Sequence, residues 1–366
     1  MTTNIFTPVT IGDLKLKNRI VMAPLTRGRA GISRTPNDFM REYYTLRASA
    51  GLIISEATTI SDQGYGWYGA PGIYTQEHCE GWKNVLEGVH SKGGLMVCQL
   101  WHMGRKAHSS FHEIPEIVAP SAIPVKTGVI ADANRKHSPP EVPRAIETHE
   151  IPNIVQDYVN AARLAKEAGF DGVEIHAANG YLIDEFLQSV SNHRTDQYGG
   201  SYENRYRFLK EIIENVNNIF PFSRIGVRIS PNGAFNDMGT EENYDFFRYV
   251  AKQLSTYKLA YIHLLDGEWR GFHGKCKAVN CYDIKTEFNG PIIANTAYTK
   301  ELANGVLRTG AADAVAFGLP FIANPDLVEK FANDLPLNPV PPLDVLFGST
   351  PDPADCVEGY LTFSKK

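Results

Sequence analysis

Val173-Glu174-Ile175-His176-Ala177-Ala178-Asn179-Gly180-Tyr181 is the most informative stretch of the chain. An apolar strand pattern opens it, and alternation along that strand puts Glu174 and His176 on one face, away from its apolar neighbours. The imidazole of His176 and the amide of Asn179, one short turn apart, can hold one oxygen atom of a ligand. The phenol of Tyr181 can deliver a proton beside that oxygen. We therefore expect a strand that ends in a binding or catalytic site.

Composition excludes several classes of protein. The chain has 366 residues and a net charge of −5, without runs of Lys or Arg, which argues against nucleic acid and anionic membranes as partners. The N-terminal residues lack the pattern of a signal peptide, and no stretch is apolar for long enough to span a membrane. Five cysteines show neither zinc spacing nor an even framework, so we expect reduced thiols in a cytoplasmic protein. They are Cys79, Cys98, Cys276, Cys281 and Cys356.

Short apolar runs alternate with helix-like stretches along the whole chain. The expected strands are residues 20–24, 52–55, 95–100, 172–176, 225–229, 261–265, 291–294 and 314–317. Expected helices include residues 80–91, 154–168, 205–217, 241–255 and 300–308, and Gly169 follows the second as a helix-ending glycine. Eight strand–helix units without a linker favour a closed (β/α)8 TIM barrel, which we predict as one domain over residues 1–366.

Two segments depart from a plain barrel. Residues 9–17 alternate around Gly12-Asp13 and predict a small N-terminal hairpin that closes the bottom of the barrel. Residues 104–150 form a long insertion after the third strand, rich in Pro, Ser and His. Insertions of this length in a βα loop are usually functional, so we expect this one over the mouth.

Strand parity brings further polar residues into the barrel interior. Gln99 and Trp101 share one face of the third strand, and Arg228 lies opposite its apolar neighbours on the fifth. A buried guanidinium needs a partner: Arg228 either pairs with Glu174 across the interior or faces an electron-rich ligand. Gln99 is likewise either a self-satisfied core amide or the donor and acceptor for a pyrimidine edge.

The loops after the seventh and eighth strands are candidates for an anion site. Residues 294–297 include Asn295 and Thr296, and residues 317–320 include Gly318 and Leu319. Both loops can present backbone N–H groups to a phosphate, or they are ordinary turns. His102, His108 and His112 have no compact set of carboxylate or Cys partners, so we expect no metal site.

Several runs together resemble one enzyme family. The matching segments are Ala23-Pro24-Leu25-Thr26, residues 51–58, 99–105, 173–181 and 191–205, Phe317-Gly318 with residues 321–325, and Glu358-Gly359-Tyr360. In these segments the chain is similar to the old yellow enzyme family of FMN-dependent ene-reductases. The resemblance runs from residue 5 to about residue 360 and implies a (β/α)8 barrel with non-covalent FMN.

The resemblance also implies roles for individual residues. Cofactor contacts would come from Pro24, Leu25, Thr26, Ala57, Gln99, Arg228, Asn295, Thr296, Gly318 and Leu319. His176 and Asn179 would bind the carbonyl or nitro oxygen of the substrate, and Tyr181 would protonate Cα after hydride reaches Cβ. Trp101, Tyr360, Trp67 and Tyr68 would shape the substrate pocket.

The implied activity is reduction of activated alkenes with NADPH or NADH as hydride donor. Nitrate esters, nitro compounds and quinones are the alternative substrates, phenols are expected ligands, and the expected protein is a monomer or homodimer. Two positions depart from the family pattern: Leu319 stands where many members carry a phosphate-binding Arg, and Thr296 where Gly is frequent. We expect backbone N–H groups, or a basic residue from elsewhere, to replace that Arg.

Overall fold

A closed parallel barrel forms the centre of the computed structural model, which describes residues 3–267, 271–347, 357 and 359–365. Its strands are β3 (Ile20–Met22), β4 (Leu52–Ile54), β6 (Met96–Trp101), β11 (Gly172–Ala177), β12 (Ile225–Ile229), β13 (Tyr261–Leu265), β14 (Ile292–Asn295) and β15 (Ala314–Phe317). Each pairs in parallel with the next, and β15 returns to β3. The short β5 (Thr58–Thr59) pairs with the end of β6. The predicted (β/α)8 barrel is confirmed.

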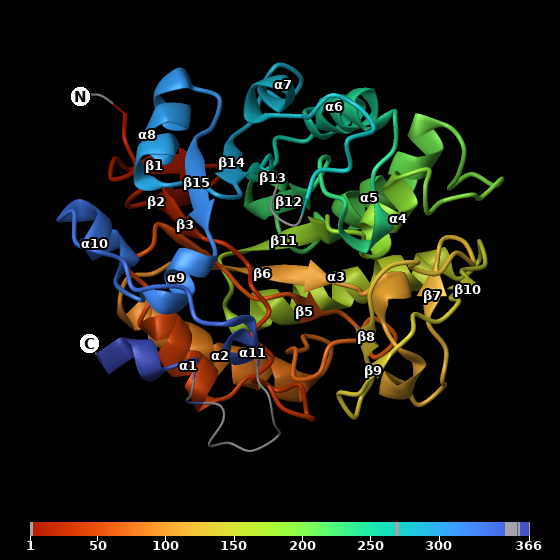
Figure 1. The fold of residues 1–366 in the computed structure, drawn as a ribbon, viewed down its shortest axis with the longest axis horizontal. Helices are drawn as coiled ribbons and strands as arrows, with labels where there is room; N and C mark the ends of the chain where they lie inside the picture. The colour runs from red at the N-terminus through yellow and green to blue at the C-terminus, as the bar shows by residue number, and fades with distance from the viewer. Residues whose placement is uncertain (1–2, 268–270, 348–356, 358, 366) are drawn as a thin grey trace.

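Helices surround the strands on the outside (Figure 1). They are α1 (Asp38–Thr45), α2 (Gln76–Ser91), α3 (Ile151–Ala168), α4 (Leu182–Leu187), α5 (Tyr202–Val216), α6 (Asn243–Leu254), α7 (Cys281–Lys285), α8 (Lys300–Thr309), α9 (Leu319–Ala323), α10 (Leu327–Ala332) and α11 (Leu343–Leu346). Side chains of Thr75, Ser201 and Thr299 cap the first turns of α2, α5 and α8. Helix α3 ends at Gly169 with φ 104°, as the sequence predicts.

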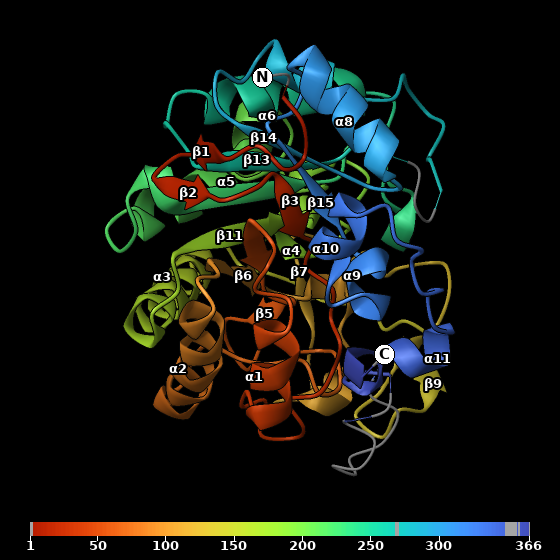
Figure 2. The ribbon, with the colours of Figure 1, turned by 90° about the vertical axis from the view of Figure 1, so that its left-hand side faces the viewer.

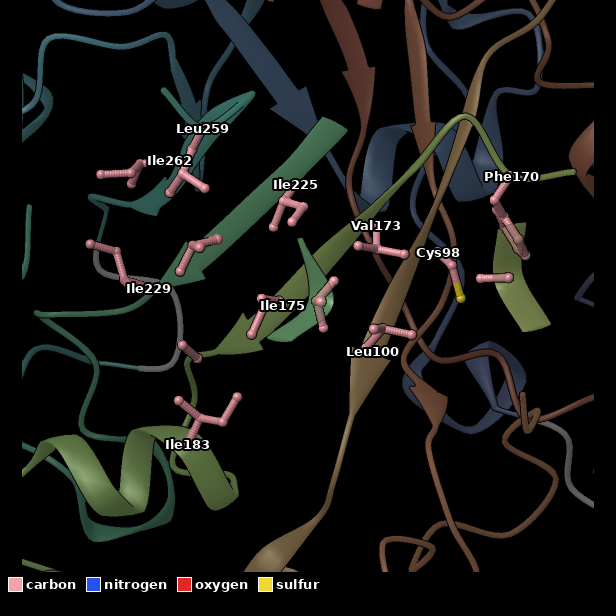
Figure 3. Packing of buried hydrophobic residues seen from close by; sticks show 14 of the residues in the cluster. Cys98, Leu100, Phe170, Val173, Ile175, Ile183, Ile225, Ile229, Leu259 and Ile262 are labelled. Carbon is pink, nitrogen blue, oxygen red and sulfur yellow. The ribbon is translucent and has the colours of Figure 1, made fainter. Parts of the chain in front are cut away.

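Two apolar layers follow from the alternation of side chains along the strands. Outward-facing residues such as Leu100, Val173, Ile175 and Ile229 pack under the helices in the larger core. Figure 3 shows them along β6, β11 and β12, with Phe170 and Ile183 from the flanking segments. Because these positions face the helices, residues 99, 174, 176 and 228 face the barrel interior.

The N-terminal hairpin seals the amino-terminal end of the barrel. Strands β1 (Val9–Ile11) and β2 (Leu14–Leu16) pair antiparallel around Gly12-Asp13. Ile11, Leu14 and Leu16 are buried in one cluster with inward-facing barrel residues. In Figure 1 the hairpin lies at the opposite end of the barrel from β7 (Val118–Ala119) and β9 (His137–Ser138), and Figure 2 views the molecule from the hairpin side. The predicted bottom closure is confirmed, and it leaves the carboxyl end as the open one.

The insertion 104–150 forms small sheets beside the mouth. Strand β7 pairs with β10 (Arg144–Ala145), and β8 (Ile130–Ala131) pairs with β9. Arg135 lies over the ring of Tyr68, and Thr127 donates to Asp237, so the insertion contacts mouth loops. Its residues line neither of the cavities described below. The insertion therefore lies next to loops of the mouth through residues 68 and 237, and its expected position over the mouth stays a prediction.

Two further findings bear on the sequence expectations. Within the described ranges, no helix combines the length and apolar character that a membrane crossing needs. Cys79, Cys98, Cys276 and Cys281 are free thiols. Cys356 lies outside the described residues.

Candidate active site

Two adjoining cavities open at the carboxyl ends of the strands. The first is lined by Pro24, Leu25, Thr26, Ala57, Trp67, Gln99, His176, Asn179, Tyr181, Arg228, Ser230, Gly233, Phe235, Leu265, Gly267, Thr296 and Phe347. The second is lined by Ala23, Pro24, Leu25, Arg228, Leu265, Asn295, Thr296, Ala297, Tyr298, Ala316, Phe317, Gly318, Leu319 and Pro320. The shared lining, which includes Arg228 and Thr296, makes them two parts of one site. This is the end at which barrel enzymes build their active sites.

A buried carboxylate, Glu174, organises the floor of the first cavity. One of its oxygens accepts from Gln99 Nε2 at 2.8 Å, and the other accepts from His263 Nδ1 at 2.9 Å. Burial alone would raise the pKa of Glu174, but His263, Arg228 and Gln99 together lower that pKa below its ordinary value. Glu174 is therefore ionised at neutral pH.

Arg228 does not pair directly with Glu174, which corrects that reading of the sequence. Its guanidinium donates to Asn295 Oδ1 at 3.0 Å, and Asn295 is turned this way because its own Nδ2 donates to the carbonyl of Ala316 at 2.9 Å. Burial lowers the pKa of Arg228 to about 10, so the group stays charged at neutral pH. Its Nε has no hydrogen-bond partner among the described residues. A fixed cation with an open donor thus borders both cavities.

His176 is neutral at physiological pH. Burial, and then the nearby charge of Arg228 and the imidazole of His263, lower the pKa of His176 well below its ordinary value. The side chain is 3% exposed, and its Nδ1 has no partner in the described part of the chain. The imidazole is therefore placed to form a neutral hydrogen bond with a ligand.

The turn after β11 holds Asn179 and Tyr181 at the cavity wall. Asn179 and Gly180 both have left-handed backbone, with φ 62° and 70°. The backbone N–H of Asn179 donates to Ser230 Oγ at 2.7 Å, and the backbone N–H of Gly180 donates to Asp184 Oδ2 at 2.8 Å. Asn236 Nδ2 donates to the carbonyl of Asn179 at 2.8 Å. Side chains from three later segments thus hold a turn of rarely populated conformation.

The ring of Tyr181 lies between two other aromatic groups. Its centroid is 5.2 Å from that of Trp101, at an interplanar angle of 84°, and 5.2 Å from the His176 imidazole, at 76°. Both contacts are edge-to-face, the arrangement that aromatic quadrupoles favour. The phenol therefore lies beside the imidazole in the same cavity.

The second cavity has a single charged group among its described lining residues. Among its described lining residues, Arg228 is the only cation, and Leu319 lies in its wall. Thr296 and Ala297 have φ 107° and 57°, a region that side chains with a β-branch rarely adopt. Glycine would adopt this backbone conformation at position 296 without strain. In this chain Thr296 adopts a backbone conformation typical of glycine, which is strained for a β-branched residue.

The match to known proteins decides the family. The model of the NADH:flavin oxidoreductase / NADH oxidase family matches residues 4–338. The chain belongs to this family, the old yellow enzyme family. It is therefore an oxidoreductase.

Individual relatives agree with this assignment. The chain is 42% identical over 336 residues to a probable flavin mononucleotide-dependent alkene reductase of Leishmania infantum, covering 90% of this chain and 91% of the relative. The solved old yellow enzyme homologue from Zymomonas mobilis is 43% identical, with a TM-score of 0.92 and 99% of each chain covered. Morphinone reductase, solved in complex with tetrahydroNAD, is 41% identical with a TM-score of 0.90, covering 99% of this chain and 97% of the other.

The donors in the site fit the FMN on which this family depends. A flavin ring needs a long apolar wall and polar groups along its pyrimidine edge. Pro24, Leu25 and Ala57 supply apolar lining, whereas Gln99 and Arg228 place polar groups at one end. The unpartnered Arg228 Nε is the sort of buried donor that a ligand satisfies.

Three aromatic residues that the resemblance assigned to the substrate pocket are not among its lining residues, and only Trp67 is. Trp101 is 1% exposed, and its ring packs edge-to-face against the ring of Tyr181. Tyr68 packs under Arg135. Tyr360 is fully buried because its ring stacks on Tyr43 at 4.1 Å and two guanidinium groups flank it. Glu358, from the same motif as Tyr360, lies outside the described residues.

Sequence reasoning missed several residues that the site uses. His263 lies on β13 beside Arg228 in register, so strand parity could have found it. Phe235 and Phe347 line the first cavity from loops, and no local signal marks them. Asp184 holds the turn after β11, but it follows the motif in the sequence without a recognisable pattern.

Asp184 and Glu185 are buried carboxyl groups on α4, which follows the turn after β11. Burial raises the pKa of Asp184 to about 7 and that of Glu185 to about 8, although Arg105 lowers the pKa of both groups. A carboxyl whose folded pKa lies above its unfolded pKa stabilises the protein at low pH. That contribution is lost as pH rises from the unfolded pKa, about 4.3, through the folded one.

Glu185→Gln tests this linkage, because the amide stays neutral at every pH. The free energy of unfolding of the variant, relative to wild type, should rise between pH 5 and pH 8 by up to about 1.4 kcal/mol per pH unit. Urea denaturation across this range measures the difference, with the exposed Glu87→Gln as control. Parallel pH profiles for wild type and Glu185→Gln would show that Glu185 is ionised throughout.

Proposed function

We propose that this chain is an FMN-dependent ene-reductase that uses NADPH or NADH to reduce activated alkenes. The substrates are α,β-unsaturated ketones and aldehydes, maleimides and nitroalkenes. One observation carries the proposal: a neutral His176, Asn179 and Tyr181 line the same cavity as Gln99 and Arg228. A protein that only stores flavin would need no proton donor beside a neutral oxygen-binding pair.

The cofactor end of the site is held by residues of both cavities. Bound non-covalently, FMN would supply the redox chemistry, accepting hydride from the nicotinamide and passing it to Cβ of the alkene. Arg228 would place its fixed charge near the pyrimidine end, where a reduced flavin is negative. Thr26 would donate near flavin O4 and tune the potential. Backbone N–H groups of residues 295–296 and 318–319 would hold the phosphate in place of the missing Arg.

The substrate end works through polarisation and proton delivery. His176 and Asn179 would donate to the carbonyl or nitro oxygen, which withdraws electrons from the double bond. A neutral imidazole suits this role, because it donates without placing a full charge beside Arg228. Tyr181 would then give its phenolic proton to Cα. Nicotinamide and alkene would use the same cavity in turn, which gives ping-pong kinetics.

Two alternatives differ from this proposal, one in the substrate and one in the class of reaction. Nitrate esters, nitro compounds and quinones can accept hydride in the same cavity, and they are the second candidate. A barrel lyase or aldolase would need a Schiff-base Lys or a metal cluster at a strand end. The lining of both described cavities contains no Lys, and no metal-binding group of His, Cys, Asp or Glu occurs among the described residues.

Tyr181→Phe separates the proton donor from the rest of the site. The variant should be reduced by NADPH at close to the wild-type rate, but its reoxidation by 2-cyclohexenone should slow at least tenfold, because general acid catalysis is worth about 10²–10⁴ in rate. Anaerobic stopped-flow absorbance at the flavin band measures each half-reaction. Tyr282→Phe, at an exposed position, is the control. Equal slowing of both half-reactions would exclude Tyr181 as the donor.

Phenols test the oxygen-binding pair, because a phenolate oxygen resembles the enolate oxygen of the reacting alkene. His176→Ala and Asn179→Ala should each raise the Kd for a phenol by roughly 10-fold or more, since a hydrogen bond to a charged group contributes about 1.5–3 kcal/mol. Titration of the flavin absorption spectrum measures the Kd, with the exposed His137→Ala as control. Unchanged phenol affinity would remove both residues from the oxygen site.

A further inference from the structure

We propose that Glu174 is a positioning residue that fixes which end of the Gln99 amide faces the cavity. It thereby sets the hydrogen-bonding pattern that the site demands of a bound ring. The inference rests on the proposed function only in that FMN is taken as the ring. Glu174 itself is not among the cavity-lining residues, so it acts through Gln99.

The orientation of Gln99 follows from the chemistry of its neighbour. Glu174 and Gln99 are opposite each other in register on β11 and β6. An ionised carboxylate can only accept hydrogen bonds, so the amide nitrogen of Gln99 must point toward it. The 2.8 Å contact between Gln99 Nε2 and Glu174 Oε1 has this sense. The carbonyl oxygen of Gln99 is thus directed away from Glu174 and is available to the cavity.

His263 prevents the carboxylate from turning away. It reaches Glu174 from β13, two strands along, with its Nδ1 at 2.9 Å from the second carboxylate oxygen. Gly226 is the register partner of Glu174 on the strand between them and has no side chain. A Cβ at Gly226 would lie 2.3 Å from the ring of Tyr261, so the packing requires glycine there. Both carboxylate oxygens of Glu174 therefore accept a hydrogen bond, one from Gln99 and one from His263.

Packing alone does not explain an ionised group at this place. Glu174 is 0% exposed, and burying a carboxylate costs several kcal/mol even after relaxation. A neutral amide of the same shape would fill the space without that cost. What the carboxylate adds is direction, because an amide can accept at one end and donate at the other, whereas a carboxylate only accepts.

This orientation gives the cavity one hydrogen-bond acceptor and one hydrogen-bond donor at fixed positions. Gln99 offers its carbonyl oxygen, and Arg228 offers guanidinium N–H groups to the same cavity. The pyrimidine edge of a flavin presents one ring N–H flanked by two carbonyl oxygens. The Gln99 oxygen therefore selects the ring N–H, and a flavin methylated at that nitrogen (3-methyl-FMN) should be rejected.

Glu174→Gln should reverse this selection with little change in shape. The new side chain keeps an oxygen for His263 Nδ1 and then presents its NH2 group to Gln99. Gln99 must rotate to accept that hydrogen bond, and its own NH2 group then faces the cavity. The ring N–H of FMN would meet a donor, and 3-methyl-FMN would lose its disadvantage.

The test is the ratio of the Kd of 3-methyl-FMN to the Kd of FMN. Each Kd is measured by quenching of flavin fluorescence on titration with the full chain freed of flavin. We expect a ratio of at least about 10 for wild type, because a site built around a hydrogen bond discriminates strongly against an analogue that lacks it. The ratio should fall below about 3 in Glu174→Gln and in Gln99→Leu. His263→Gln, which disturbs the same network but keeps the carboxylate, should retain the wild-type ratio.

A double-variant cycle separates orientation from general damage. Glu174→Gln should not change the ratio further once Gln99 is Leu, because its effect passes through the amide. If Glu174→Gln raises the Kd of both flavins by the same factor, so that the ratio stays at the wild-type value, the inference is wrong. A wild-type ratio retained in Gln99→Leu would overturn it as well, even if Glu174→Gln fails to fold. If wild type binds neither flavin, the proposed function fails, and this inference fails with it.

Discussion

A carboxylate buried inside the barrel is the constraint on which the rest of the site depends. Glu174 is ionised with no exposed surface, so its surroundings must supply donors and a compensating charge. Gln99 and His263 supply the donors, and Arg228 supplies the charge from a neighbouring strand. The positive charge in turn helps to keep His176 neutral. One buried group thus links the cofactor end of the cavity to the substrate end.

The fold makes such a polar interior possible by dividing the barrel along its axis. At the amino-terminal end, the hairpin β1–β2 and inward-facing apolar residues form a buried hydrophobic cluster that closes the barrel. Toward the carboxyl ends, the inward positions change to Gln99, Glu174, His176 and Arg228. The strained segments, residues 179–180 and 296–297, both follow barrel strands and border the cavities. Rarely populated backbone is thus found where ligands are bound, and the apolar layers that surround it pack regularly.

The barrel and much of the site could be predicted because both follow from local rules. Strand alternation placed Gln99, His176 and Arg228 in the interior, and the run 173–181 placed Asn179 and Tyr181 at a strand end. Partner choice was not predictable: Arg228 binds Asn295, and Glu174 binds His263, because both pairings depend on how far each strand is staggered. The environment of Tyr360 was not predictable either, because its ring contacts Tyr43, Arg27 and Arg29, which are remote in sequence. Loop residues such as Phe347 carry no periodic signal at all.

The central claim is that one cavity first takes hydride from a reduced nicotinamide and then gives it to an activated alkene. The most direct measurement is anaerobic: the purified protein is reduced with NADPH, 2-cyclohexenone is added, and the flavin absorption band is followed. We predict that the band bleaches with NADPH and recovers when the enone is added. Bleaching without recovery would contradict the alkene acceptor and favour nitro compounds or quinones. Absence of a flavin band would contradict the FMN site itself.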